Sequence, residues 1–251
     1  IQAVCMSSDS PLVPAAILPL VMTTGNAAAP KRPTPAVSAD RYVDATLELI
    51  AETGGSLDVN LRAVSRRLGC AHTNVYNYFD SYGDLLWAAF RRALRTYGGQ
   101  LTAGLEVDMP AEAYLQRTIE NLASFPQLNP GLYRFIGSDP IDLATIPPDI
   151  LVTVTAMKRW FAATIAAAAG PRLDAEQARA VADMVLAYVD GETLNLINGR
   201  SIPNEDLGGR VVTNAMHIFD LTVTDRLGRR ARRGNGPPPD PSSIFGRSPD
   251  R

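Results

Sequence analysis

The feature that most constrains the fold is the stretch 60–79, in which a glycine separates two short helical patterns. Asn60 is a residue type that caps helices well, and three apolar residues follow it at helical spacing: Leu61, Val64 and Leu68. Gly69 readily adopts a positive φ and is expected to end this first helix. Val75 and Phe79 set the inward face of a second helix. The stretch therefore predicts a helix-turn-helix.

The outward face of the second helix carries an unusual polar set: His72, Thr73, Asn74, Tyr76, Asn77 and Tyr78. A solvated helix more often shows Glu and Lys. Asn can bond adenine through two atoms, Thr can contact a thymine methyl group, and Tyr can reach a phosphate oxygen. The stretch 60–79 also has three arginines and no acidic residue, a local charge of +3. The pattern favours a DNA-reading face over the alternative, a helical hairpin with an ordinary polar surface.

The charge is unevenly distributed along the 251 residues, whose net charge is −2. Residues 106–225 contain 16 acidic and 8 basic side chains, whereas residues 38–104 contain seven of each. The local basic patch therefore precedes an acidic body. A hydrophobic content of 46% is enough for a core, so the chain is expected to be globular.

Cysteine and histidine are scarce. Cys5 and Cys70 do not make a disulfide framework, so a reducing cytoplasm is the expected location. His72 and His217 are the only histidines in the sequence, so we expect neither a metal site nor histidine-based catalysis. No cofactor is expected.

Helical periodicity and Pro or Gly punctuation divide the rest of the chain. Ser38 has the properties of an N-cap, and Ser81 and Asp84 have the spacing of a capping box. The expected helices lie at about 40–53, 60–68, 73–79, 83–97, 110–125, 130–137, 148–169, 174–199 and 204–225. The sequence thus predicts an all-α fold, and no run is expected to be long enough to span a membrane.

The residues from Arg41 to Phe90 resemble the TetR family of one-component transcriptional regulators. They combine a leading amphipathic helix, the run Leu-Gly-Cys-x-x-x-Asn-Val-Tyr-x-Tyr-Phe-x-Ser from Leu68, and a Leu-Leu pair in the next helix. The resemblance implies an N-terminal helix-turn-helix head of three helices, joined through a fourth helix to a C-terminal bundle for ligand binding and dimerisation. It also implies a homodimeric repressor that a small molecule releases from palindromic operator DNA. The DNA-facing residues it implies are Arg62, His72, Thr73, Asn74, Tyr76, Asn77, Tyr78 and Tyr82.

Three positions depart from the family pattern. Ala71 stands where a capping side chain usually opens the second helix, and losing a cap costs about 1 kcal/mol. Tyr82 stands where the family commonly has a phosphate-contacting Lys, so we expect a hydroxyl contact and a shallower salt dependence. Cys70 replaces an aliphatic residue, and we interpret it as a small packed thiol; a redox sensor is the alternative.

The helices expected at 174–199 and 204–225 each carry two apolar stripes. One stripe of 174–199 contains Ala178, Val181, Ala182, Val185, Val189 and Leu196, and the other contains Met184, Ala187, Tyr188, Gly191 and Leu194. In 204–225, Val211, Ala215, Ile218 and Leu221 form one line, and Val212, Met216, Phe219 and Val223 form another. A helix that is apolar on two sides is buried on two sides. We expect a twofold four-helix bundle between two subunits, with a larger monomeric bundle as the alternative.

The family's effector cavity corresponds to the middle helices of this chain. Their apolar and aromatic candidates for binding an effector are Phe125, Tyr133, Phe135, Met157, Trp160, Phe161, Met184 and Tyr188. The alternative for each one is an ordinary core position. Few charged residues fall among these positions, so we expect an apolar or aromatic effector rather than a highly charged one.

The expected division of the chain is a disordered head (1–37), a DNA-binding domain (38–84), an effector and dimerisation domain (85–225) and a disordered tail (226–251). Five arginines between Arg226 and Arg233 are expected to be solvated, although a flexible arm on DNA phosphate is an alternative. Two other functions are alternatives. A DNA-binding protein without a small ligand predicts a filled core, and an all-helical enzyme would need a convergent acid, base or metal site.

Overall fold

The first two helices begin and end at the residues whose capping chemistry predicts these boundaries. The computed structural model describes residues 37–201, 206–227 and Asp240. The Ser38 hydroxyl accepts a hydrogen bond from the Arg41 N–H (3.4 Å) at the start of α1 (Ala39–Thr53), and the Asn60 side chain accepts one from the Ala63 N–H (3.1 Å) at the start of α2 (Leu61–Leu68). Gly69 ends α2 with a φ of 67°, as expected.

Every other expected helix is present. They are α3 (Tyr82–Leu101), α4 (Ala111–Leu128), α5 (Pro130–Gly137), α6 (Pro148–Ala169), α7 (Ala175–Ile197) and α8 (Leu207–Leu227), with the short 3-10 helices η1 (His72–Asn77), η2 (Leu143–Thr145) and η3 (Gly170–Arg172). The described residues contain no strand, so the predicted all-α class is confirmed. At the start of α3, the Ser81 hydroxyl accepts from the Asp84 N–H (3.1 Å) and donates to the Asp84 carboxylate (2.8 Å).

The second helix of the helix-turn-helix differs from the prediction. It was expected to be α-helical over 73–79, but it is the single 3-10 segment η1, which ends at Asn77. Ala71 precedes it and makes no capping hydrogen bond through its side chain. Six residues without a cap favour the tighter 3-10 geometry, which occurs in short pieces.

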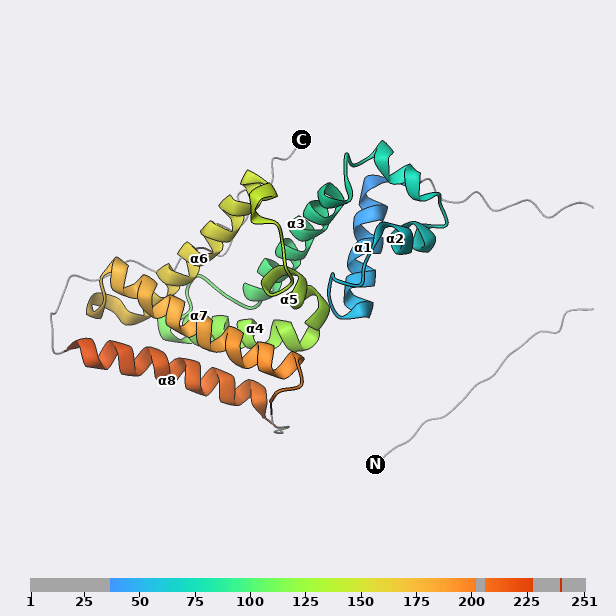
Figure 1. The fold of residues 1–251 in the computed structure, drawn as a ribbon. Coiled ribbons are helices and arrows are strands. Elements are labelled where there is room, and N and C mark those ends of the chain that lie inside the picture. Colours follow the sequence, from blue (N-terminus) through green and yellow to red (C-terminus); the bar gives the residue numbers. More distant parts are fainter. Residues whose placement is uncertain (1–36, 202–205, 228–239, 241–251) are drawn as a thin grey trace, which may run out of the picture. The chain divides into compact units, whose positions relative to one another are not determined.

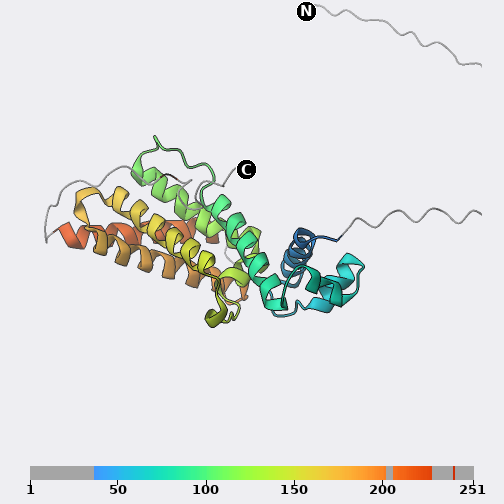
Figure 2. The same cartoon turned by 90° about the horizontal axis from the view of Figure 1, so that it is seen from above.

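Two groups of helices lie along α3. In both views α1, α2 and η1 lie at one end of it, whereas α4, α6, α7 and α8 lie toward its other end (Figures 1 and 2). The short helix α5 contacts α1, α3 and α4 and therefore stands between the two groups. The expected domain boundaries follow this division but stay predictions, and the predictions for residues 1–36, 228–239 and 241–251 lie outside the described residues.

The helix α6 corrects the expectation about membrane spans. By length and composition alone, the stretch Pro148–Arg172 could cross a membrane, because its most apolar window has a mean hydropathy of 1.3. In this fold, however, α6 packs against α4 and α7 and buries Trp160, Phe161 and Ile165. A core helix of a bundle passes the same test of length and hydropathy.

The helices α7 and α8 expose part of their apolar surface. The first predicted stripe of α7, from Ala178 to Val189, is buried in the core. In contrast, Met184 is 43% exposed and Leu221 on α8 is 69% exposed. Phe219 and Val223 are buried, so the two predicted lines of α8 do not separate into an inner and an outer face. The exposed apolar side chains on both helices are available to a partner.

Candidate DNA interface and effector cavity

The core of the head holds η1 in place from beneath. Val75 is fully buried, and the Tyr42 ring of α1 packs against the rings of Tyr78 and Phe79 at centroid distances of 5.7 and 6.4 Å. Cys70 packs at the edge of this core, with its Sγ 3.2 Å from the Tyr42 hydroxyl oxygen. Burial, together with this hydrogen bond, raises the pKa of Tyr42 to about 12. Cys70 therefore packs as a small side chain beside a neutral hydroxyl group.

Most of the predicted DNA-facing residues lie on the outside of α2 and η1. Arg62, His72, Thr73, Tyr76 and Asn77 are exposed, and Asn74 is half-buried. The Asn77 amide nitrogen donates to the Asn74 side-chain oxygen at 2.8 Å, so the two asparagines orient each other across one turn. The pair lies within η1, whose last residue is Asn77, and its amide groups include both hydrogen-bond donors and acceptors.

Two predicted DNA contacts are already engaged within the protein. The Tyr78 hydroxyl donates to the Val37 carbonyl oxygen at 2.6 Å and the Tyr82 hydroxyl to the Val59 carbonyl oxygen at 2.8 Å. Each phenol has one proton to donate, so neither hydroxyl donates to a phosphate in this conformation. Burial raises the pKa of Tyr82 to about 12, which keeps it a neutral donor to Val59. The expectation that Tyr82 replaces a phosphate-binding lysine is therefore not supported by its geometry.

The substitution Tyr82→Phe tests this reassignment. It removes the hydrogen bond to Val59, and we expect a loss of about 1 kcal/mol in the free energy of unfolding. We expect unchanged DNA affinity and unchanged salt dependence. Urea denaturation and fluorescence anisotropy measure the two quantities. Reduced DNA affinity with unchanged stability would return Tyr82 to the DNA interface.

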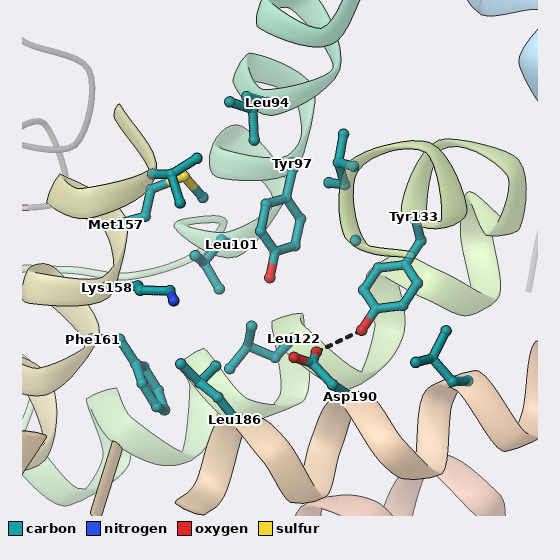
Figure 3. A pocket seen from close by; sticks show the side chains of 14 residues that line it. Leu94, Tyr97, Leu101, Leu122, Tyr133, Met157, Lys158, Phe161, Leu186 and Asp190 are labelled. Carbon is teal, nitrogen blue, oxygen red and sulfur yellow. Dashed lines mark hydrogen bonds between the residues drawn. The ribbon is translucent and has the colours of Figure 1, made fainter. Parts of the chain in front are cut away.

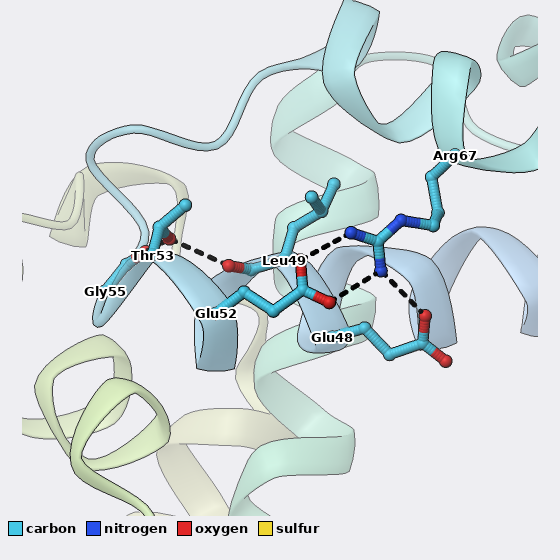
Figure 4. Close-up of polar contacts among 6 residues, drawn as sticks. All are labelled: Glu48, Leu49, Glu52, Thr53, Gly55 and Arg67. Atoms are coloured by element: carbon cyan, nitrogen blue, oxygen red, sulfur yellow. Dashed lines mark hydrogen bonds and ion pairs between the residues drawn. The ribbon is translucent and has the colours of Figure 1, made fainter.

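The basic patch is smaller than its sequence suggests. Arg67 faces α1, where it forms ion pairs with Glu48 at 3.2 Å and Glu52 at 2.5 Å (Figure 4). The hydrogen bonds from Arg67 lower the pKa of Glu52. Within the part of the chain that the structure describes, Arg62 and Arg66 form no ion pair. These two residues therefore carry the charge available to DNA, while Arg67 fastens α2 to α1.

A cavity of about 300 Å³ lies between α3, α4, α5, α6 and α7 (Figure 3). Of the eight predicted effector contacts, Tyr133, Met157 and Phe161 line it. The alternative function, a regulator without a small ligand, predicts a filled core. The cavity beside Tyr133, Met157 and Phe161 does not match that prediction.

The other five predicted contacts lie elsewhere. Phe125 packs behind Tyr97 with ring centroids 4.9 Å apart, and Trp160 packs against Tyr114 at 6.3 Å. Phe135 packs on Phe90 and lines a second, smaller cavity of about 160 Å³. Met184 is exposed on the outer surface of α7, and the Tyr188 hydroxyl accepts from the Asn214 amide at 2.9 Å. These five do not line the cavity of about 300 Å³, and their part in effector binding stays a prediction.

The prediction missed the cavity's polar residues: Tyr97, Lys158 and Asp190. The Tyr133 hydroxyl donates to the Asp190 carboxylate at 2.5 Å (Figure 3). Loss of hydration raises the pKa of Asp190, whereas Tyr133 and the charge of Lys158 act to lower it. An acidic residue within an apolar stretch of α7 was the available sequence signal. The expectation of few charges near the cavity is corrected.

The helix α5 links this cavity to the head. Tyr133 lines the cavity, and the next residue, Arg134, donates to the carbonyl oxygens of Gly54 at 3.4 Å and Ile197 at 2.6 Å. After α5, the Asp139 carboxylate accepts from the N–H and hydroxyl of Ser56 at 2.6 and 2.7 Å. These hydrogen bonds join α5 and the residue segment after it to the loop that follows α1.

The described residues contain no group of three or more His, Cys, Asp or Glu side chains placed to hold a metal ion.

Comparison with known proteins defines the class of fold. No family model matches the sequence, and no curated protein matches it. Among solved structures, a transcriptional regulator from Rhodococcus sp. Rha1 is 20% identical, with a TM-score of 0.56 over 76% of this chain and 97% of its own. A TetR-family regulator from Streptomyces coelicolor is 16% identical, with a TM-score of 0.56 over 76% and 88% of the two chains.

A TetR variant from Acinetobacter baumannii AYE, solved in complex with minocycline, is 14% identical, with a TM-score of 0.50 over 76% of this chain and 99% of its own. At these identities the likeness concerns the fold. The chain has the fold of the TetR-family transcriptional regulators, which confirms the resemblance of residues 41–90.

Proposed function

We propose that this chain is a DNA-binding transcriptional regulator that a small molecule controls. The observation that carries the proposal is the TetR fold with the polar face of η1 exposed at the place where this fold presents its reading helix. Arg62, His72, Thr73, Asn74, Tyr76 and Asn77 form the proposed DNA contacts, with Tyr78 at their edge. Asn74 and Asn77 read base edges, whereas Arg62 binds phosphate.

We propose that the regulator acts as a homodimer, because one short reading helix contacts too few bases for a specific site. The exposed apolar side chains of α7 and α8 support this assembly, with Met184 and Leu221 at the contact. A twofold axis then presents two heads to two half-sites of a palindromic operator.

The dimer predicts the effect of Leu221→Glu. A charge buried at the subunit contact is costly, so we expect the dimer dissociation constant to rise by about tenfold or more. Val107→Glu is the matched control, because Val107 is 67% exposed but lies in the loop before α4. Light scattering over a dilution series measures both variants. A Leu221→Glu protein that stays as dimeric as the control contradicts this contact.

In the proposed mechanism the effector occupies the cavity and the DNA affinity falls. Tyr133 and Arg134 are neighbours on α5, so a ligand that displaces Tyr133 also moves the Arg134 and Asp139 contacts to the head. The two heads then no longer match successive major grooves, which releases a repressor from its operator. The cavity of about 300 Å³ favours this mechanism over control by a protein partner or by abundance alone.

The proposal is tested by the binding of the purified protein to DNA fragments that flank its own gene. We expect a retarded complex in electrophoresis, with two chains on each site. A folded protein that retards none of the fragments more than unrelated DNA of the same length contradicts the proposal.

A further inference from the structure

The polar groups of the cavity converge on one place. Tyr97 comes from α3, Tyr133 from α5, Lys158 from α6 and Asp190 from α7, and the remaining walls are apolar (Figure 3). The main apolar contributors are Leu94, Leu101, Leu122, Met157, Phe161 and Leu186. A ligand that fills the cavity therefore meets a small polar centre between apolar walls.

Asp190 has unused capacity to accept hydrogen bonds. One of its carboxylate oxygens accepts from Tyr133, and the other accepts no hydrogen bond from the described residues. Among the described residues, Lys158 and Asp190 form no ion pair. The charge of Lys158 nevertheless acts to lower the pKa of Asp190. A partly desolvated carboxylate with a free oxygen gains from a positively charged donor.

The Tyr97 hydroxyl is the second unused group. It points into the cavity (Figure 3), and no hydrogen bond joins it to another described residue. Burial and the charge of Asp190 raise the pKa of both Tyr97 and Tyr133, so both stay neutral phenols. Tyr97 can therefore accept a hydrogen bond from the same donor that Asp190 binds.

The environments of Lys158 and Asp190 decide which charge the ligand carries. Lys158 and Asp190 are both exposed as whole residues, but the Asp190 carboxylate is held in a part-buried hydrogen bond with Tyr133, and its partial loss of hydration raises its pKa. A cation placed beside Asp190 restores that lost stabilisation, and the aromatic rings of Tyr97 and Tyr133 are also favourable to it. A ligand carboxylate at the same place would be repelled by the like charge of Asp190.

We propose that the cavity binds an amphipathic organic amine, whose ammonium group donates to Asp190 and Tyr97 and whose apolar body lies against the leucines, Met157 and Phe161. This inference rests on the proposed function, since it names the class of effector for the same cavity. It also connects the ligand to α5, because the ammonium group binds the same carboxylate that accepts from Tyr133.

The test is isothermal titration of the full chain with three probes of matched shape: phenethylamine, phenethyl alcohol and phenylpropionate. We expect phenethylamine to bind about tenfold or more tightly than the alcohol, and phenylpropionate to bind most weakly. Equal binding of the amine and the alcohol, or tighter binding of phenylpropionate, would overturn the proposal.

Two variants make the test more specific, because one removes a negative charge and the other removes a positive charge. Asp190→Asn keeps an acceptor for Tyr133 but removes the charge, so the preference for the amine over the alcohol should disappear. Lys158→Met changes an exposed side chain, so the fold should persist and amine affinity should rise a few-fold. A Lys158→Met protein that binds the amine more weakly would overturn the assignment even if Asp190→Asn fails to fold.

The ligand class and the regulatory role are separable. Titration needs no DNA, so it decides the amine proposal alone. If the amine binds through Asp190 but leaves operator affinity unchanged, the ligand class stands and the regulatory mechanism fails.

Discussion

Replacement of Gly131 by alanine is expected to destabilise the protein by about 1–3 kcal/mol. A Cβ at this position of α5 would overlap the carbonyl oxygen of Ile50 and lie 3.1 Å from the Cα of Ala51, both in the backbone of α1. A backbone atom cannot move aside by changing rotamer, so α5 must shift away from the head. This shift also strains the Arg134 and Asp139 contacts, so the DNA response to an effector should weaken. Urea denaturation measures the stability change.

Gly99→Ala is the matched control for Gly131→Ala. Gly99 lies inside α3, and a Cβ added there meets nothing within 4 Å. Alanine is the better helix former by about 1 kcal/mol, so this variant should be as stable as the parent or more stable. If both variants behaved alike, helix propensity would explain the result and the close approach of α5 to α1 would not matter.

Replacement of Asn74 or Asn77 by alanine is expected to cost about 1–3 kcal/mol of binding free energy on the cognate operator, with a smaller loss on random DNA. Because the Asn77 amide donates to the Asn74 oxygen, each side chain orients the other. The double variant should therefore lose less than the sum of the two single losses. Anisotropy titrations on both kinds of duplex measure these losses.

Arg62→Gln serves as the comparison for the asparagine variants. Arg62 is exposed on α2, and a phosphate contact there carries no sequence information. We expect this variant to weaken binding to operator and random DNA by similar factors and to reduce the salt slope by about one. Equal losses on both duplexes for the asparagine variants would mean that they too only position the backbone.

Local chemistry made the helices of this chain predictable. Ser38 and Asn60 cap the starts of α1 and α2, and Gly69 ends α2, as their chemistry predicts. These positions are predictable because a cap depends on a few neighbouring atoms. The exception is η1, where the sequence shows the missing cap at Ala71 but not its effect on the type of helix. Whether a short uncapped segment becomes an α-helix or a 3-10 helix depends on the packing of Val75 and its neighbours.

The cavity was less predictable, because periodicity gives the face of a helix but not the helix that covers it. Phe125 and Met184 have the same pattern as Phe161, yet Tyr97 covers the first, and the second is 43% exposed in the described part of the chain. Similarly, Tyr82 has the sequence position of a DNA contact, but the carbonyl oxygen of Val59 lies within its reach. Such partners come from residues far apart in the chain, and they appear only when the fold is known.

The central claim, that this chain is a dimeric sequence-specific DNA-binding regulator, is tested most directly by selecting sites from a random DNA pool with the purified protein. The account predicts enrichment of an inverted repeat whose half-sites lie about one helical turn apart or more. Asn74→Ala should alter the bases preferred within each half-site. A pool that shows no enrichment, or that enriches only single half-sites, would contradict the account.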